Sequence, residues 1–153
     1  MVANRKQQSM LVTTLLNATL FSIKNIIPLE SNFNKSERLK DYPSIDQGIQ
    51  IGLTGDIKGA LIFNSDNETF SSIGEEMYGI TLNEDMLQSF SGELSNMIAG
   101  GITTYLAKYN TNINITTPIF LQRAPEILAY KDVLKLLIRF KQNGELNTYL
   151  LLK

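Results

Sequence analysis

The first third of the chain begins with apolar residues at helical spacing. From about residue 7 to Ile27, apolar side chains recur every three or four positions, which predicts an amphipathic helix that ends at Pro28. Polar residues such as Thr13 and Asn17 interrupt the apolar run, which is also shorter than the ~20 residues of a membrane span. We therefore expect a helix of a cytoplasmic protein rather than a signal peptide. The apolar positions are Leu11, Leu15, Leu16, Leu20, Ile23 and Ile27.

The pattern then changes from helical spacing to the alternation of strands. Residues 30–47 are mostly polar and predict a loop, with an edge strand at its end as an alternative. Residues 48–54 alternate apolar and polar side chains, and residues 58–63 are largely apolar. Because the turn-forming pair Gly55-Asp56 separates these two segments, they predict an antiparallel hairpin.

Two further helices are expected after this hairpin. Asp66 is a suitable N-cap for a short helix that runs to about Tyr78 and is closed by Gly79. A long helix follows over about residues 84–109. Thr81 and Glu84 have the spacing of a capping box, and Asn83 is a competing cap for the same helix.

The C-terminal third is rich in strand-forming residues. Residues 110–120 predict a strand that is broken or ended near Pro118. Residues 130–141 and 145–152 predict a hairpin joined at Asn143-Gly144, a pair that favours a type I′ turn. Since strands arrive in hairpins rather than alternating with helices, we expect a single α+β domain over residues 1–153. Its antiparallel sheet would be built from hairpins, with helices packed against it.

Composition narrows the possible chemistry. The 153-residue chain has a net charge of −1, so phosphate-driven nucleic-acid binding is not favoured. It contains no cysteine and no histidine, which excludes disulfides, Cys/His metal sites, a cysteine nucleophile and a Ser-His-Asp triad. Any chemistry must use carboxylates, amides, hydroxyls, lysines, arginines or a bound ion.

The most informative segment lies in the long helix, over residues 89–101. Helical geometry places Ser89, Glu93, Asn96 and Gly100 on one face. A separate apolar sector can dock on the sheet, which leaves the polar stripe open to solvent or to a partner. The apolar sector consists of Leu87, Phe90, Leu94, Ile98, Ile102 and Tyr105.

Each feature of this stripe has a structural alternative. The pair Gly100 and Gly101 would let another protein approach closely, or would pack against a neighbouring element of the same domain. Glu93 and Asn96 by themselves would also fit an ordinary solvated helix face. Spacing alone does not decide between these interpretations.

The spacing Ser89-x-x-x-Glu93-x-x-Asn96 resembles the Ser/Asp-x-x-x-Glu-x-x-Asn signature of the CheC, CheX and FliY chemotaxis phosphatases. The string GELSNMIAGG, residues 92–101, is especially similar to CheX members, and the resemblance extends over most of the chain. CheC members carry two such motifs. Here the first helix has Asn17 without a glutamate three residues before it, which favours the CheX arrangement, a single CheX-like domain with a CheC-like fold.

The resemblance implies a phosphatase acting on the phospho-aspartate of a CheY-like response regulator. It implies that Asn96 orients the attacking water and that Glu93 contacts the lysine of the receiver domain. Ser89 would shape the surface that binds the partner, or would bond back within the helix. Gly100 and Gly101 would lie in the same surface. No cofactor of the chain's own is implied, since the receiver supplies Mg²⁺.

The resemblance also implies a homodimer formed by joining sheets. The aliphatic run 133–138 is compatible with it, but would equally suit a core strand buried on both faces. We expect no nucleic-acid or membrane partner. Two other functions stay open: a non-catalytic receiver-binding or signalling-scaffold module, and a helix with a purely structural role. Neither the response regulator nor the pathway, chemotaxis or another two-component system, follows from the sequence.

Overall fold

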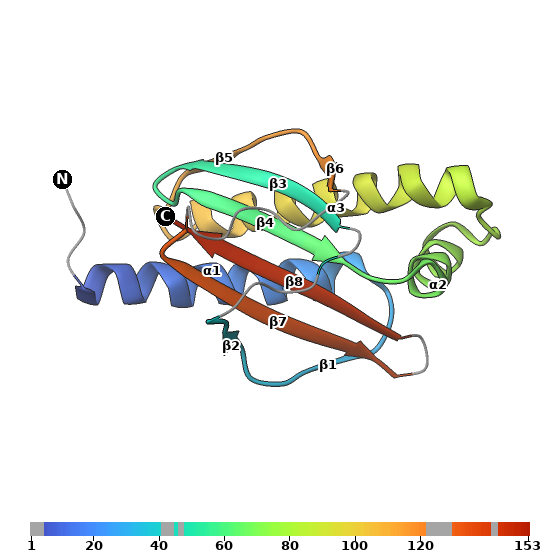
Figure 1. Cartoon of the computed structure of the whole chain (residues 1–153), viewed down its shortest axis with the longest axis horizontal. Coiled ribbons are helices and arrows are strands. Elements are labelled where there is room, and N and C mark those ends of the chain that lie inside the picture. The colour runs from blue at the N-terminus through green and yellow to red at the C-terminus, as the bar shows by residue number, and fades with distance from the viewer. Residues whose placement is uncertain (1–4, 41–44, 46–47, 122–129, 142–143) are drawn as a thin grey trace.

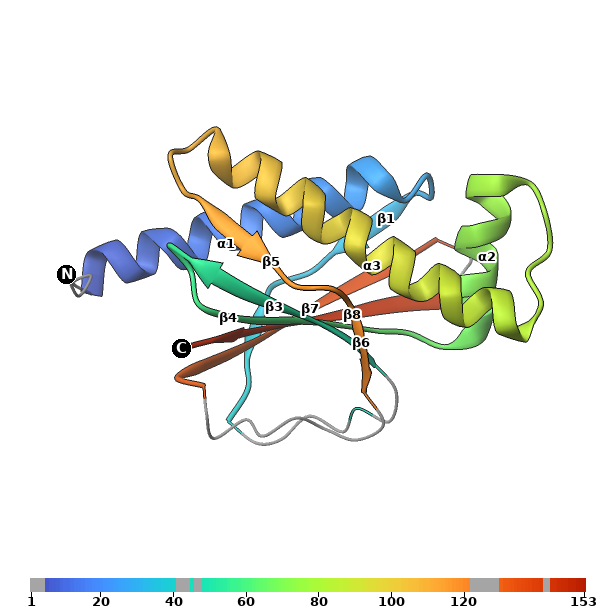
Figure 2. The ribbon, with the colours of Figure 1, turned by 90° about the horizontal axis from the view of Figure 1, so that it is seen from above.

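The fold is an antiparallel sheet with helices on one face. The structure is a computed structural model that describes residues 5–40, 45, 48–121, 130–141 and 144–153. Figure 2 shows α1 (Arg5–Ile26) and α3 (Glu84–Ala107) running along the same face of the sheet. The shorter α2 (Asn67–Tyr78) lies at one end of the sheet (Figure 1). The three predicted helices and the α+β class are thus confirmed.

The caps of α2 are those predicted. The Asp66 carboxylate accepts a hydrogen bond from the Thr69 N–H at 2.7 Å, and so satisfies one of the free donors of the first turn. Gly79 closes the helix in the left-handed conformation, with φ of 71°, where glycine carries no steric penalty.

At the start of α3 the capping box predicted from Thr81 and Glu84 is wrong. Asn83 is the N-cap, and its side-chain oxygen accepts a hydrogen bond from the Met86 N–H at 2.9 Å. Glu84 is therefore the first residue of the helix, not the third, and cannot reach back as a capping box requires. The competing cap, Asn83, determines where the helix begins.

Among the described residues, the sheet contains eight strands. Six of them follow the order β1-β7-β8-β4-β3-β5, while β2 pairs with β7 and β6 pairs with β3. All the pairings are antiparallel. The strands are β1 (Ser31–Phe33), β2 (Glu37–Arg38), β3 (Gly48–Gly55), β4 (Gly59–Asn64), β5 (Ile113–Ile115), β6 (Ile119–Leu121), β7 (Asp132–Phe140) and β8 (Gly144–Leu152).

Both predicted hairpins, β3–β4 and β7–β8, are confirmed. Asn143 lies outside the described residues, so the type of the second turn stays a prediction. The predicted strand over 110–120 is broken as expected: β5 and β6 flank Pro118 and pair with different parts of β3. Residues 30–47 differ from a plain loop, because β1 and β2 both pair with β7.

Apolar side chains cover both faces of the sheet. The larger cluster fills the space between the sheet and the helices and includes Leu61 and Leu136. A smaller cluster on the opposite face contains Ile45, Ile62 and Val133. The run 133–138 is therefore a core strand, and β7 has pairing partners on both sides among the described residues. Burial within the domain accounts for this run without a dimer.

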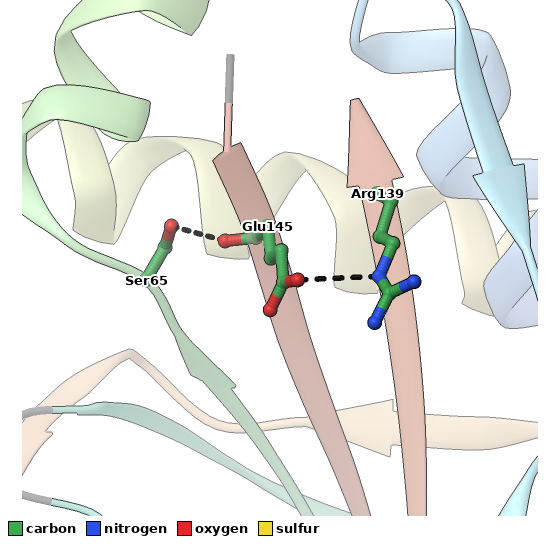
Figure 3. A network of polar contacts seen from close by, with 3 residues as sticks. All are labelled: Ser65, Arg139 and Glu145. Carbon is green, nitrogen blue, oxygen red and sulfur yellow. Dashed lines mark hydrogen bonds and ion pairs between the residues drawn. The ribbon is translucent and has the colours of Figure 1, made fainter. Parts of the chain in front are cut away.

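A polar network joins the entry of α2 to the β7–β8 hairpin (Figure 3). The Ser65 hydroxyl donates to the main-chain oxygen of Glu145, and the Glu145 carboxylate accepts from the Arg139 Nε at 3.2 Å. Thr69 of α2 is buried and lies so close to Gly144 that a Cβ there would meet its hydroxyl. These contacts set the position of α2 relative to the sheet.

Candidate functional site

The long helix α3 has one face in the core and one face outside it. Phe90, Leu94, Ile98 and Ile102 are buried in the main core cluster. Leu87 and Tyr105 are partly buried against the same cluster. The predicted apolar sector is thus confirmed, and it fixes which side of α3 faces outward.

The predicted polar stripe lies on that outward side. The side chains of Ser89, Glu93 and Asn96 are exposed, and Gly100 is half-buried in the same row. Since successive members are three or four residues apart, they stand one above the other along a regular helix. A rigid helix in the core therefore presents an amide, a carboxylate and a hydroxyl together.

The glycine pair separates into two different environments. A Cβ at Gly100 would meet nothing within 4 Å, so the surface there is open. Gly101 faces α1, where a Cβ would collide with the hydroxyl of Ser22. That hydroxyl donates to the Ile98 carbonyl across the two helices at 2.7 Å. Gly101 thus has the packing role, while Gly100 leaves room beside the stripe.

The serines of α3 differ in how they use their hydroxyls. Those of Ser91 and Ser95 donate to carbonyls within the helix, at 2.8 and 2.7 Å. No such bond from the Ser89 hydroxyl is found within the described residues, so the back-bonding alternative is not seen for this side chain. Its hydroxyl and the Asn96 amide both face solvent.

Two aromatic residues beside the stripe could not be predicted from the sequence. The Tyr78 hydroxyl, at the end of α2, lies 3.4 Å from the Glu93 Oε1. On the other flank, the Phe120 ring of β6 covers Gly92, where a Cβ would lie 3.2 Å from the ring. Both residues come from other elements, and no local pattern connects them with the motif.

Exposed apolar side chains accompany the stripe. They lie on α3 itself or on the segments that border it, and each is more than a third exposed. Such residues around a polar centre are typical of a surface that binds another protein. They are Tyr78, Ile80, Met86, Met97 and Phe120.

The stripe lies on an exposed helix face, outside the two main hollows that the described residues form. Two hollows of about 390 and 460 Å³ are lined by other residues, and neither includes Glu93 or Asn96. Small-molecule sites are concave, whereas an exposed helix face suits a macromolecular surface. An amide and a carboxylate presented in this way can orient a water and pair with a cation on a partner.

Neither a metal cluster nor a membrane helix is found in the part of the chain that the structure describes. No three acidic side chains gather there as ligands for an ion. No helix among those residues is long and apolar enough to cross a bilayer.

Comparisons with known proteins agree with this arrangement. The chain is 26% identical over 148 residues to the CheY-P phosphatase CheX of Thermotoga maritima. The alignment covers 94% of this chain and 96% of that protein. Its fold matches a CheC-like superfamily protein from Shewanella sp. PV-4 with a TM-score of 0.75, at 20% identity, covering 93% and 96% of the two chains.

The fold also matches a chain of the CheX–CheY–BeF3–Mg²⁺ complex from Borrelia burgdorferi. The TM-score is 0.70 at 18% identity, with 93% of this chain and 97% of that chain covered. The sequence profile of the family described as chemotaxis phosphatase CheX matches residues 48–141, which is more than half of the chain and includes the whole stripe. On these grounds the protein belongs to the CheX family of chemotaxis phosphatases.

Proposed function

We propose that this protein dephosphorylates the phospho-aspartate of a CheY-like response regulator, with Asn96 orienting the attacking water. The observation that carries the proposal is the exposed Ser89, Glu93 and Asn96 stripe on a core-packed helix of a CheX family member. It is supported by a relative named CheY-P phosphatase and by a structural neighbour solved in complex with CheY.

The reaction requires little covalent chemistry from this chain. Water attacks the phosphorus, and the bond between phosphorus and the aspartate oxygen breaks. Inorganic phosphate leaves, and the receiver regains its carboxylate. Catalysis of phosphoryl transfer is largely positioning and charge stabilisation, and positioning can contribute several kcal/mol. The Asn96 carbonyl oxygen can accept a hydrogen bond from the water and hold it in line with the breaking bond.

Glu93 has a docking role in this mechanism. A carboxylate one turn from Asn96 can pair with the active-site lysine of the receiver, in a charge-assisted hydrogen bond. That pairing would fix the register in which the Asn96 amide enters the receiver site. Ser89 and the open surface at Gly100 would let the receiver's loops approach α3.

The chemistry that Mg²⁺ supplies would come with the partner. We propose that the receiver brings both the metal and the lysine that neutralise the phosphoryl oxygens, and that this chain adds only side chains. A phosphatase of this kind needs neither histidine nor cysteine, in keeping with a sequence that contains neither.

The first test is loss of phosphate from a phosphorylated CheY-like receiver. We expect the wild-type protein to accelerate this loss and Asn96→Ala to reduce the acceleration by about 10²-fold or more, as for other lost positioning contacts. Asn17→Ala is a matched control, because Asn17 is also exposed on a helix but lies in α1. It should retain full activity.

Two outcomes of this assay would contradict parts of the proposal. Full activity of a folded Asn96→Ala variant would refute the water-positioning role. A receiver that binds without faster dephosphorylation would make this domain a non-catalytic binding or scaffold module. In the same assay, Glu93→Ala should weaken receiver binding more than it slows turnover at saturation.

The assembly and its location are further parts of the proposal. We expect a homodimer in the cytoplasm, where phosphorylated response regulators act. Light scattering on the purified protein should give twice the chain mass of 17.2 kDa. A mass of one chain at micromolar concentration would contradict the dimer.

A further inference from the structure

Tyr78 joins the end of α2 to the glutamate of the stripe. Its hydroxyl donates to the Glu93 Oε1 at 3.4 Å, and its side chain is 48% exposed. The ring also meets Phe90 edge to face, with centroids 5.8 Å apart and an interplanar angle of 82°. Tyr78 therefore has an aromatic contact with the core side of α3 and a polar contact with its outward side.

The fold sets the position of the Tyr78 ring, because the helix that carries it is anchored to the core and to the sheet. Tyr78 is the last residue of α2, immediately before the left-handed Gly79. Phe70 and Ile73 anchor α2 in the main core, and Ser65 ties its entry to β8. The Phe90 contact then fixes the direction in which the hydroxyl points.

The hydroxyl is suited to donate rather than to ionise. Partial desolvation, the neighbouring Glu93 charge and their hydrogen bond all raise the pKa of Tyr78. A tyrosine phenol, with an ordinary pKa of about 10, is already protonated at neutral pH, and the raised pKa acts in the same direction. The Tyr78 hydroxyl engages one carboxylate oxygen of Glu93. The second oxygen has no partner among the described residues and can accept a hydrogen bond from a cation.

We propose that Tyr78 is a positioning residue that holds the Glu93 carboxylate ready for the lysine of the receiver. The inference rests on the proposed function, since it assigns Glu93 to docking. A glutamate side chain that is free in solution must lose rotamer freedom on binding, and a pre-oriented one loses less. The contact is longer than the ~2.7–2.8 Å of a typical O–H···O bond, so the effect is modest.

The test compares Tyr78→Phe with the wild type in binding a beryllofluoride-loaded CheY-like receiver. The substitution removes the hydroxyl and keeps the ring on Phe90. We expect the dissociation constant to rise about three- to tenfold, which is less than for a short hydrogen bond to a charged group because this contact is long. Turnover at saturating receiver should stay unchanged. Tyr109→Phe, which alters a more exposed tyrosine just beyond α3, is the matched control and should leave the affinity unchanged.

A double-mutant cycle separates positioning from structural support. In a Glu93→Ala background, Tyr78→Phe should have no further effect on affinity, because there is no carboxylate left to hold. The same loss in both backgrounds would mean that Tyr78 acts without Glu93, and would overturn the inference. Unchanged affinity of Tyr78→Phe in the wild-type background would overturn it as well.

A second measurement needs no receiver and so distinguishes this inference from the proposed function. In the free protein, Glu93→Gln should lower the pKa of Tyr78. NMR titration of the tyrosine ring carbons measures this pKa. An unchanged pKa of Tyr78 would show that the two side chains do not interact. It would refute the inference even if the phosphatase is active. A wild-type protein that neither binds nor dephosphorylates any receiver, with the expected titration intact, would instead refute the docking role of Glu93 and the function together.

Discussion

At the scale of single residues, one step along α3 changes the role of a side chain. Successive helical positions differ by about 100°, so neighbouring residues face different surroundings. Gly101 faces α1 and Gly100 faces open space. Asn96 is exposed, whereas Ser95 beside it is buried and bonded to the Ser91 carbonyl.

Alanine substitutions at the two glycines should change the free energy of unfolding in opposite directions. Gly100→Ala should raise the free energy of unfolding by up to about 1 kcal/mol, because alanine is the better helix former and nothing obstructs its Cβ. Gly101→Ala should lower it by about 1–3 kcal/mol, because the new methyl group collides with Ser22. Denaturant unfolding of both variants measures the difference.

Ser22→Ala supplies the control for this pair. It removes the hydroxyl that a Cβ at position 101 would meet first. Combined with Gly101→Ala, it should therefore cost less than the sum of the two single changes. Additive losses would mean that the contact between α1 and α3 differs from the one described. A destabilised Gly100→Ala would mean that the surface at Gly100 is not open.

At the scale of elements, α3 serves both the core and the site. Its buried residues fix its rotation about its own axis, and that rotation turns Glu93 and Asn96 outward. The start of the helix depends on one side chain, since Asn83 satisfies the Met86 N–H. The N-cap therefore sets the residue at which α3 begins, and the buried residues set which side of the helix faces outward.

Removing the N-cap side chain of α3 tests how much it contributes to stability. Asn83→Ala should lower the free energy of unfolding by about 1 kcal/mol, as for other N-cap asparagines. Thr81→Ala, two residues earlier at an exposed position, should change it by less than about 0.5 kcal/mol. If chemical denaturation gave the larger loss for Thr81→Ala, the capping box predicted from the sequence would be restored.

At the scale of the whole molecule, the sheet is a layer with apolar residues on both faces. Leu61 points into the cluster beneath the helices, and its neighbour Ile62 points into the cluster on the other face. Both side chains have no exposed surface. A sheet covered on one face only would leave Ile62 in water.

Ile62→Ala and Leu61→Ala should therefore be similarly costly. Each should lower the free energy of unfolding by about 2–5 kcal/mol, the usual range for a large aliphatic side chain removed from a core. Equilibrium unfolding in urea gives both values. A loss below about 1 kcal/mol for Ile62→Ala, typical of surface changes, would show that the second face is not a true core.

Features that depend on a local repeat could be predicted from the sequence, for a physical reason. Helices, hairpins and the outward stripe follow from periodicity, because the repeat of a helix or strand fixes which residues share a face. Periodicity placed Glu93 and Asn96 on the outward face of α3, while the role expected of them came from the family that their spacing resembles. Asn83 could not be separated from the capping box, since both caps fit the same local sequence.

Contacts between distant segments were decided by the tertiary structure alone. Local patterns could not place Tyr78 beside Glu93, Phe120 over Gly92, or Gly101 against Ser22, because each pair meets only after separate elements pack. Nor could they show that β1 and β2 would extend the sheet beside β7. The sequence by itself thus determined which residues face outward together on α3. Only packing decided what surrounds them, since the free energy of those contacts depends on residues far apart in the chain.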